Sequence, residues 1–225
     1  KNVSNKNIAG AMMFFPVTGL ILGLFTSTLY NLLAFFGFSQ FVLSIIAVIA
    51  LIVLTGGMHL DGLSDTADAF FSNKPKEQML AIMRDSHAGV MGVLCIICVI
   101  LLKIGLLSSI EPALIAPSLI LMCVLSRWSA VFAIFLFPYA RKEGKAAIFA
   151  NGINLRIFLI TTIIAFACAY FILQTKALLI ALIAAGTVFL FGKYSVRKID
   201  GITGDVLGAV IELTETAVLF SISLG

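Results

Sequence analysis

The chain has 225 residues, of which 61% are hydrophobic and 12% are charged, with a formal net charge of +4. Soluble domains are about half apolar and about a quarter charged, so this composition excludes an ordinary soluble fold. The net charge does not indicate a nucleic-acid partner, because most basic residues flank apolar runs and membrane topology accounts for them. The sequence therefore predicts an all-α protein, a single integral membrane domain over residues 1–225 embedded in a lipid bilayer.

Seven apolar stretches approach the length of about 20 residues that a helix needs to cross a bilayer. They are 12–38, 41–60, 89–107, 112–137, 157–173, 177–191 and 205–224. The polar segments near 61–88, 138–156 and 192–204 lie between some of them. We expect a polytopic transmembrane helical bundle of about seven spans, with these three segments as cytoplasmic loops.

Basic residues are distributed asymmetrically around the predicted spans. With the N-terminus in the cytoplasm, twelve of the 15 Lys and Arg residues fall in cytoplasmic segments, and the opposite side has only short turns. An excess of Lys and Arg marks the cytoplasmic side of a membrane protein. Every acidic cluster also falls on that side, so we expect a functional site that faces the cytoplasm.

Three aspartates recur at helical spacing in the segment GGMHLDGLSDTADAF. Asp61, Asp65 and Asp68 would share one face of a helix, because they are four and three residues apart. Like charges on one face repel unless a cation lies between them, and carboxylate oxygens are suitable ligands for Mg²⁺. The alternative is a solvated helix face, which would normally mix charge signs. We expect these aspartates to hold Mg²⁺.

A second polar group, Arg84-Asp85-Ser86-His87, comes just before the third predicted span. Asp85 either completes the metal site or pairs with Arg84 at a helix start. His59 and His87 have no ligand partner at helical spacing. A local hydrogen-bonding role is the more common one for such histidines, with catalysis or metal ligation as the alternatives.

The last predicted span carries acids on one helical stripe, at Asp205, Glu212 and Glu215. Ionisable residues inside a span are costly and indicate function, while helix packing by protonated carboxyls is the alternative. Thr203 precedes the stripe, where free N–H groups at a helix start can bind phosphate.

Basic side chains complete the predicted site. Arg127 lies within a span and needs a partner, for which the acidic stripes are the obvious candidates. Arg141 and Lys145 follow that span and either bind phosphate or obey the positive-inside rule. Carboxylates for a metal and basic groups for phosphate are the parts of metal-assisted phosphoryl or nucleotidyl transfer.

The segments GGMHLDGLSDTADAF, MRDSHAGVMGVL, SRW, YARKEG and GITGDVLGAVIELTE, in this order, resemble the cobalamin synthase family. Its members are adenosylcobinamide-GDP ribazoletransferases, also called cobalamin-5′-phosphate synthases. The resemblance implies a multi-pass enzyme of a bacterial or archaeal cytoplasmic (inner) membrane. This enzyme would join adenosylcobinamide-GDP to α-ribazole or α-ribazole 5′-phosphate with Mg²⁺ and release GMP, a late step of cobalamin biosynthesis.

The resemblance also implies roles for individual residues. Catalytic roles fall on Asp61, Asp65, Asp68, Asp85 and Asp205, of which the first four would bind the metal. Substrate binding falls on His59, Arg84, Ser86, Arg127, Arg141, Lys145, Thr203 and Glu212. The resemblance further implies Gly at position 200, where this chain has Asp.

Two other classes of protein share some of these features. A cation- or proton-coupled membrane transporter also carries acids within its spans. A lipid-headgroup phosphotransferase would use the same metal chemistry with a lipid acceptor. A homo-oligomer is compatible with the sequence in each case.

Overall fold

The computed structural model describes residues 5–141, 144 and 146–224, and every regular element in these ranges is helical. The all-α prediction is therefore confirmed. The elements are α1 (Asn5–Gly10), the 3-10 helix η1 (Ala11–Phe14), α2 (Phe15–Phe35), α3 (Gln40–Thr55), α4 (Met58–Phe71), α5 (Lys76–Ile82), α6 (Val90–Ser109), α7 (Pro112–Leu136), α8 (Ala147–Gly152), α9 (Leu155–Leu173), α10 (Lys176–Ile199) and α11 (Gly204–Ser223).

Six helical stretches in the described part of the chain are each long and apolar enough to cross a membrane. They are Ile8–Phe35, Val90–Ser109, Pro112–Leu136, Leu155–Leu173, Lys176–Ile199 and Gly204–Ser223. The second predicted span, 41–60, differs from the structure, because α3 ends at Thr55 and α4 leaves it at 89°. Gly56 and Gly57 form the break with φ of +62° and +70°, a left-handed conformation that glycine adopts at little cost.

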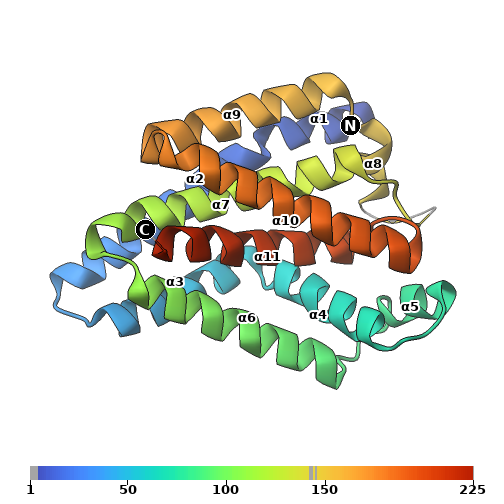
Figure 1. Cartoon of the computed structure of the whole chain (residues 1–225), viewed down its shortest axis with the longest axis horizontal. Coiled ribbons are helices and arrows are strands. Elements are labelled where there is room, and N and C mark those ends of the chain that lie inside the picture. Colours follow the sequence, from blue (N-terminus) through green and yellow to red (C-terminus); the bar gives the residue numbers. More distant parts are fainter. Residues whose placement is uncertain (1–4, 142–143, 145, 225) are drawn as a thin grey trace.

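The bent pair of α3 and α4 runs along the whole of α6 (Figure 1). At the C-terminal end of α6, the Gln40 amide of α3 donates to the carbonyl of Ile110 at 2.7 Å. At the opposite end of α6, Asp68 of α4 accepts from the Gly89 N–H at 2.7 Å. We infer that the pair forms one broken crossing, which brings the number of crossings to seven.

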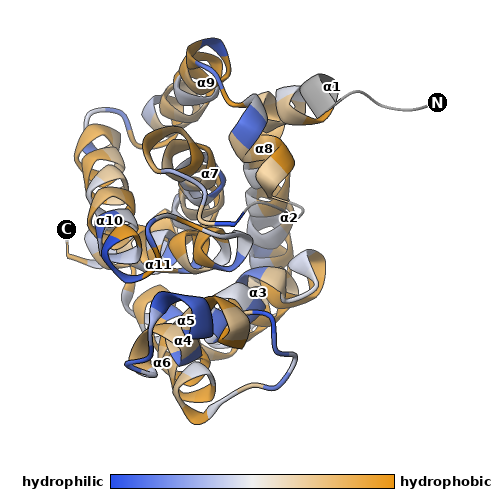
Figure 2. Cartoon of the chain, turned by 90° about the vertical axis from the view of Figure 1, so that its right-hand side faces the viewer, coloured by the Kyte–Doolittle hydropathy of each residue, from blue (hydrophilic) through white to orange (hydrophobic). Residues whose placement is uncertain are grey.

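The polar connections gather at one end of the bundle. In Figure 1 the loops around α5 and α8 lie on the right, and the short turns and the end of α11 lie on the left. Figure 2 looks onto the right-hand end, where α5 and the neighbouring loops are largely hydrophilic. The loops are shorter than predicted. Residues 61–71 are helical within α4, and α10 continues to Ile199, because its last turns still bury Ser195 and Ile199.

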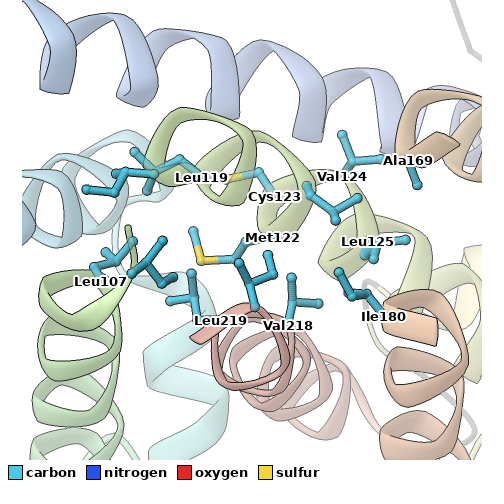
Figure 3. Packing of buried hydrophobic residues seen from close by; sticks show 14 of the residues in the cluster. Leu107, Leu119, Met122, Cys123, Val124, Leu125, Ala169, Ile180, Val218 and Leu219 are labelled. Atoms are coloured by element: carbon cyan, nitrogen blue, oxygen red, sulfur yellow. The ribbon is translucent and has the colours of Figure 1, made fainter. Parts of the chain in front are cut away.

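Helix α7 lies at the centre of the bundle and carries the core. Its residues Leu119, Met122 and Leu125 meet Val218 and Leu219 of α11 in one hydrophobic cluster (Figure 3). Helix α2 packs on its other side at Gly19 and Gly23, where an added Cβ would lie 2.3 Å and 2.5 Å from α7 backbone atoms. Small residues permit such close approach between helices in membranes. The packing of α7 therefore fixes the position of its C-terminal end, where the chain enters the polar end of the bundle.

Candidate active site

Two glycines bring α4 and α11 together at the polar half of the bundle. A Cβ on Gly62 would lie 2.7 Å from the carbonyl oxygen of Asp205, and one on Gly208 would lie 3.0 Å from the carbonyl oxygen of His59. The two backbones can approach this closely only because neither position has a side chain. The crossing places Asp205 beside the acidic face of α4.

The carboxylates of the two helices form one acidic cluster. Asp65 interacts electrostatically with Asp61, Asp205 and Asp68, and also with the guanidinium of Arg141. Asp61 is exposed and Asp65 is half-buried. Within the described residues, the carboxylates of Asp61 and Asp65 have no hydrogen-bonding or ion-pairing partner. The described residues therefore leave these two carboxylates available to bind another group.

Asp68 differs from the other two aspartates of α4. Its Oδ2 accepts a hydrogen bond from the Gly89 N–H at 2.7 Å, and its Oδ1 accepts one from the Gly92 N–H at 2.9 Å. Both donors belong to the first turn of α6, which has no cap from its own N-cap residue, Gly89. Asp68 thus caps a neighbouring helix.

A short backbone pairing brings Arg141 to the cluster. The Ile202 N–H donates to the carbonyl of Pro138 at 2.9 Å, and the Ala140 N–H donates to the carbonyl of Ile202 at 2.8 Å. As a result, Nη2 of Arg141 lies 2.9 Å from Oδ2 of Asp205, with the two side chains 12% and 22% exposed. The contact is an ion pair without hydrogen-bond alignment, and the buried Nε has no partner among the described residues. The guanidinium therefore retains free donors.

The start of α11 adds polar groups that surround Arg141. The hydroxyl of Thr203 accepts from the Val206 N–H at 3.3 Å and caps the helix. The phenol of Tyr139 lies beside the Gly204 N–H, and Arg84 lies within electrostatic range of the same phenol. Burial raises the pKa of Tyr139 above its ordinary value. Sequence analysis did not single out Tyr139, although its position in YARKEG beside Arg141 was a usable signal.

The loop 84–88 is exposed at the polar end. His87 Nδ1 lies 2.6 Å from Oδ1 of Asp85, and the His87 N–H donates to the same oxygen at 3.1 Å. The suggested pairing of Asp85 with Arg84 at a helix start is wrong, because α5 ends at Ile82 and α6 begins at Val90. Ser86 is exposed in this loop, and Lys145 lies outside the described residues.

A second charged cluster is buried inside the bundle, away from the loops. Lys103 of α6 pairs with Glu212 at 2.6 Å and with Glu215 at 2.5 Å, and Arg127 of α7 pairs with Glu215. The prediction that Arg127 finds a partner among the acids is confirmed. His59 and these four residues line a small cavity of about 20 Å³, room for roughly one water. Lys103 was missed as a partner, although a lone cation within a span requires one.

The residues of the acidic cluster fit a hydrated Mg²⁺. Asp61, Asp65 and Asp205 bring three carboxyl groups together with the single guanidinium of Arg141. In the described part of the chain, no group of three or more His, Cys, Asp or Glu side chains is placed so that it could hold a metal ion by itself. Mg²⁺ seldom relies on such a group, since it keeps several waters and is bound by one or two carboxylates together with substrate phosphates.

The fold and the site define a polytopic helical membrane protein with an acidic, arginine-bearing site at its polar end. A family model described as cobalamin-5-phosphate synthase matches residues 1–223. The chain therefore belongs to the cobalamin-5-phosphate synthase family, and both the predicted family and the prediction of an enzyme are confirmed.

Relatives from several bacteria support this assignment, and each is named adenosylcobinamide-GDP ribazoletransferase. The protein of Acetivibrio thermocellus is 41% identical over 214 residues, covering 95% of this chain and 86% of the relative. The protein of Thermoanaerobacter pseudethanolicus is 38% identical over 220 residues, with 97% and 88% covered. The Escherichia coli protein is 37% identical over 226 residues, with 96% and 89% covered. No solved structure matches the chain.

Proposed function

We propose that the chain is a Mg²⁺-dependent transferase that joins adenosylcobinamide-GDP to α-ribazole, or to its 5′-phosphate, and releases GMP. The names of the relatives supply the two substrates. The observation that carries the proposal to this chain is the placement of Asp61, Asp65 and Asp205 against Arg141. Phosphoryl transfer needs groups that hold a metal and groups that neutralise phosphate, and this cluster offers both.

The proposed reaction exchanges one phosphate ester linkage for another. A ribose hydroxyl oxygen that is free in both α-ribazole and its 5′-phosphate forms a bond to the phosphorus that carries cobinamide. The bond from that phosphorus to the bridging oxygen of the pyrophosphate breaks, and GMP leaves with this oxygen. The proton of the hydroxyl passes to a carboxylate of the acidic cluster, which acts as general base.

Individual residues have separate tasks in this proposal. Asp61 and Asp65, whose carboxylates are unpaired, would hold Mg²⁺, which when bound neutralises charge on the pyrophosphate. Arg141 offers its free Nε to a phosphate oxygen, and Asp205 keeps the guanidinium in place. Arg84 and Thr203 lie around the same point and contribute to anion binding.

The site is proposed to face the cytoplasm from a bacterial inner membrane. The acidic cluster includes Asp205 in the first turn of α11, which follows a polar connection at the end of the bundle that Figure 2 faces. Most Lys and Arg residues of the chain belong to the polar connections of that end. The positive-inside rule places such loops in the cytoplasm.

The buried cluster favours an enzyme over an ion transporter. Glu212 and Glu215 are ion-paired with Lys103 and Arg127, and the cavity beside them has room for only about one water. A cation path would need acids along a continuous polar route through the membrane. A lipid-headgroup phosphotransferase would share the metal chemistry, so the acceptor has to be tested directly.

The test uses the full chain in nanodiscs with adenosylcobinamide-GDP, α-ribazole or its 5′-phosphate, and Mg²⁺. Chromatography should show GMP and the cobalamin product appearing in equal amounts, and only with Mg²⁺. Asp65→Asn should be slower by roughly 100-fold or more, because it removes one charge from the metal site. Glu111→Gln changes an exposed acid at the other end of the bundle and should match the parent. No product from the folded parent with either acceptor would overturn the proposal, and transfer to lipid would replace it.

A further inference from the structure

The three aspartates of α4 share one face but do not share one environment. Asp61 and Asp65 have unpaired carboxylates within the described residues. Both oxygens of Asp68, in contrast, accept backbone N–H groups, from Gly89 at 2.7 Å and from Gly92 at 2.9 Å. A hydrogen bond to a charged acceptor is among the stronger ones in proteins. The carboxylate of Asp68 is therefore already engaged by two backbone N–H groups of the protein.

The start of α6 is shaped around this carboxylate. A Cβ on Gly89 would lie 2.4 Å from Oδ1 of Asp68, and one on Gly92 would lie 2.4 Å from its Oδ2. Neither glycine has a positive φ, so conformational freedom does not account for them. Their lack of a side chain is needed for the close approach of Asp68 to the helix N-terminus.

The contact also fixes one end of the exposed loop 84–88. The other end is held at Met83, which is buried and whose sulfur lies 3.7 Å from the hydroxyl of Thr203, next to Asp205. Between these two anchors the loop carries Arg84, which lies within electrostatic range of Tyr139 at the site. Asp68 therefore connects the acidic helix to the loop that lies beside the cluster.

We propose that Asp68 is a positioning residue and not a metal ligand. It fastens the N-terminus of α6, and with it the loop 84–88, to α4, while Asp61 and Asp65 bind the metal. The inference rests on the proposed function, because it divides the tasks of that same site. It predicts that the contact between Asp68 and α6 can be broken without loss of metal affinity.

The test compares Asp68→Asn and Gly89→Ala with Asp65→Asn and the parent, all as full chains in nanodiscs. The Asn side chain has a single acceptor oxygen, so it loses one of the two N–H bonds. Gly89→Ala keeps the carboxylate of Asp68 but displaces it. In both variants, amide exchange in the peptide over residues 89–93 should accelerate by about tenfold or more, because these amides lose a charged acceptor.

Metal affinity is measured separately, by titrating Mn²⁺ and following its electron paramagnetic resonance signal. Asp68→Asn and Gly89→Ala should bind Mn²⁺ as the parent does, whereas Asp65→Asn should bind it much more weakly. In turnover, the first two variants should raise KM for adenosylcobinamide-GDP more than they lower kcat, because they displace the loop with Arg84.

Two results would overturn the inference. One is a loss of Mn²⁺ binding in Asp68→Asn while Gly89→Ala binds normally, since that pattern belongs to a ligand carboxylate. The other is unchanged amide exchange over residues 89–93 in both variants. A parent that binds no Mn²⁺ would count against the proposed function instead, and the exchange measurement would still decide whether Asp68 fastens α6.

Discussion

Nη2 of Arg141 lies 2.9 Å from Oδ2 of Asp205, and both side chains are mostly buried. The pairing joins the loop after α7 to the first turn of α11, and the strand-like contact between Tyr139 and Ile202 holds it in place. Asp205 also contributes to the acidic cluster of α4. The ion pair therefore sets one positive group against several carboxylates, which is the arrangement that a phosphate bound through a cation requires.

Arg141 should be more sensitive to the shape of its side chain than to its charge. Arg141→Lys keeps the charge but removes the planar fork that binds phosphate oxygens, so we expect KM for adenosylcobinamide-GDP to rise by roughly tenfold. Arg141→Ala should lower kcat/KM by roughly 100-fold or more. Arg197→Ala removes an exposed Arg of α10 and serves as the control in the same steady-state assay. A parental KM in Arg141→Lys would contradict the role of the guanidinium.

The crossing of α4 and α11 depends on the missing side chain of Gly62. In Gly62→Ala the new Cβ would lie 2.7 Å from the Asp205 carbonyl oxygen, so one of the helices must move. Overpacking of this kind costs about 1–3 kcal/mol, and here it also moves Asp205 away from Asp65. We expect a lower unfolding midpoint in detergent together with a large loss of kcat.

Gly105→Ala is the matched control for that measurement. Gly105 lies on an exposed part of α6, where a Cβ would meet nothing within 4 Å. Alanine favours the helix by about 1 kcal/mol over glycine, so this variant should be as stable as the parent or slightly more so. If Gly62→Ala were equally well tolerated, the close crossing would not be what positions Asp205.

Hydropathy and helical spacing were sufficient to predict the membrane bundle and the shared face of Asp61, Asp65 and Asp68. They could not predict the break in the second span, because the apolar run 41–60 contains only the pair Gly56-Gly57 as a signal. Glycine also occurs within continuous membrane helices, so its conformation had to come from the structure. The N-terminus of α4 and the position of His59 follow from this break.

Contacts between segments far apart in the chain were the other feature that the sequence could not predict. The spacing of Asp68 from Asp65 is the same whether its carboxylate faces a metal or the start of α6. Likewise, nothing near Lys103 in the chain identifies Glu212 and Glu215 as its partners, because they lie on α11. Local periodicity predicts faces of helices, whereas tertiary packing decides which faces meet.

The buried charges should be interdependent. Lys103→Met leaves Glu212 and Glu215 without the Lys103 ammonium in the bundle interior, and breaking a buried pair in this way costs about 3–5 kcal/mol. We expect a strongly lowered thermal unfolding midpoint in detergent. The double variant Lys103→Met, Glu212→Leu removes one charge of each sign and should recover part of the loss. Equal destabilisation in the single and double variants would contradict the coupling of the two residues.

The exposed pair of His87 and Asp85 should titrate as a unit. The carboxylate raises the pKa of His87, and the imidazolium in turn lowers the pKa of Asp85. The stabilisation due to His87 is complete below its unfolded pKa of about 6.5 and is lost as the pH rises through the higher folded value. The stabilisation due to Asp85 is complete above a pH of about 3.9, its unfolded pKa, and is lost as the pH falls through its lowered folded pKa.

The ion pair is therefore strongest at pH values between the folded pKa of Asp85 and that of His87. Nuclear magnetic resonance can follow its titration, because the chain contains only two histidines. We expect the imidazole of His87 to titrate above its ordinary pKa in the parent and to return toward that value in Asp85→Asn. His59→Gln identifies the remaining signal. If His87 titrated identically in Asp85→Asn, its imidazole would not be in contact with the Asp85 carboxylate in the folded protein.

Asp200 occupies a position where backbone conformation and side-chain pairing have opposite effects on stability. Its φ is +57°, which favours glycine, while its carboxylate lies 2.8 Å from Nζ of Lys76. Because the Asp200 side chain is 77% exposed, the ion pair contributes at most about 1 kcal/mol. Asp200→Gly loses this pair but relieves the backbone, so its stability should stay within about 1 kcal/mol of the parent.

Asp200→Ala loses the pair and keeps an unfavourable left-handed conformation, so it should be the least stable of the three proteins, by about 1–2 kcal/mol. Lys76→Gln removes only the ion pair and therefore measures the contribution of that pair to stability. Unfolding midpoints in detergent for the parent and the three variants give the order directly. If Asp200→Ala matched Asp200→Gly, the strain at φ +57° would not limit stability, and the Lys76 contact would account for the whole effect of the aspartate.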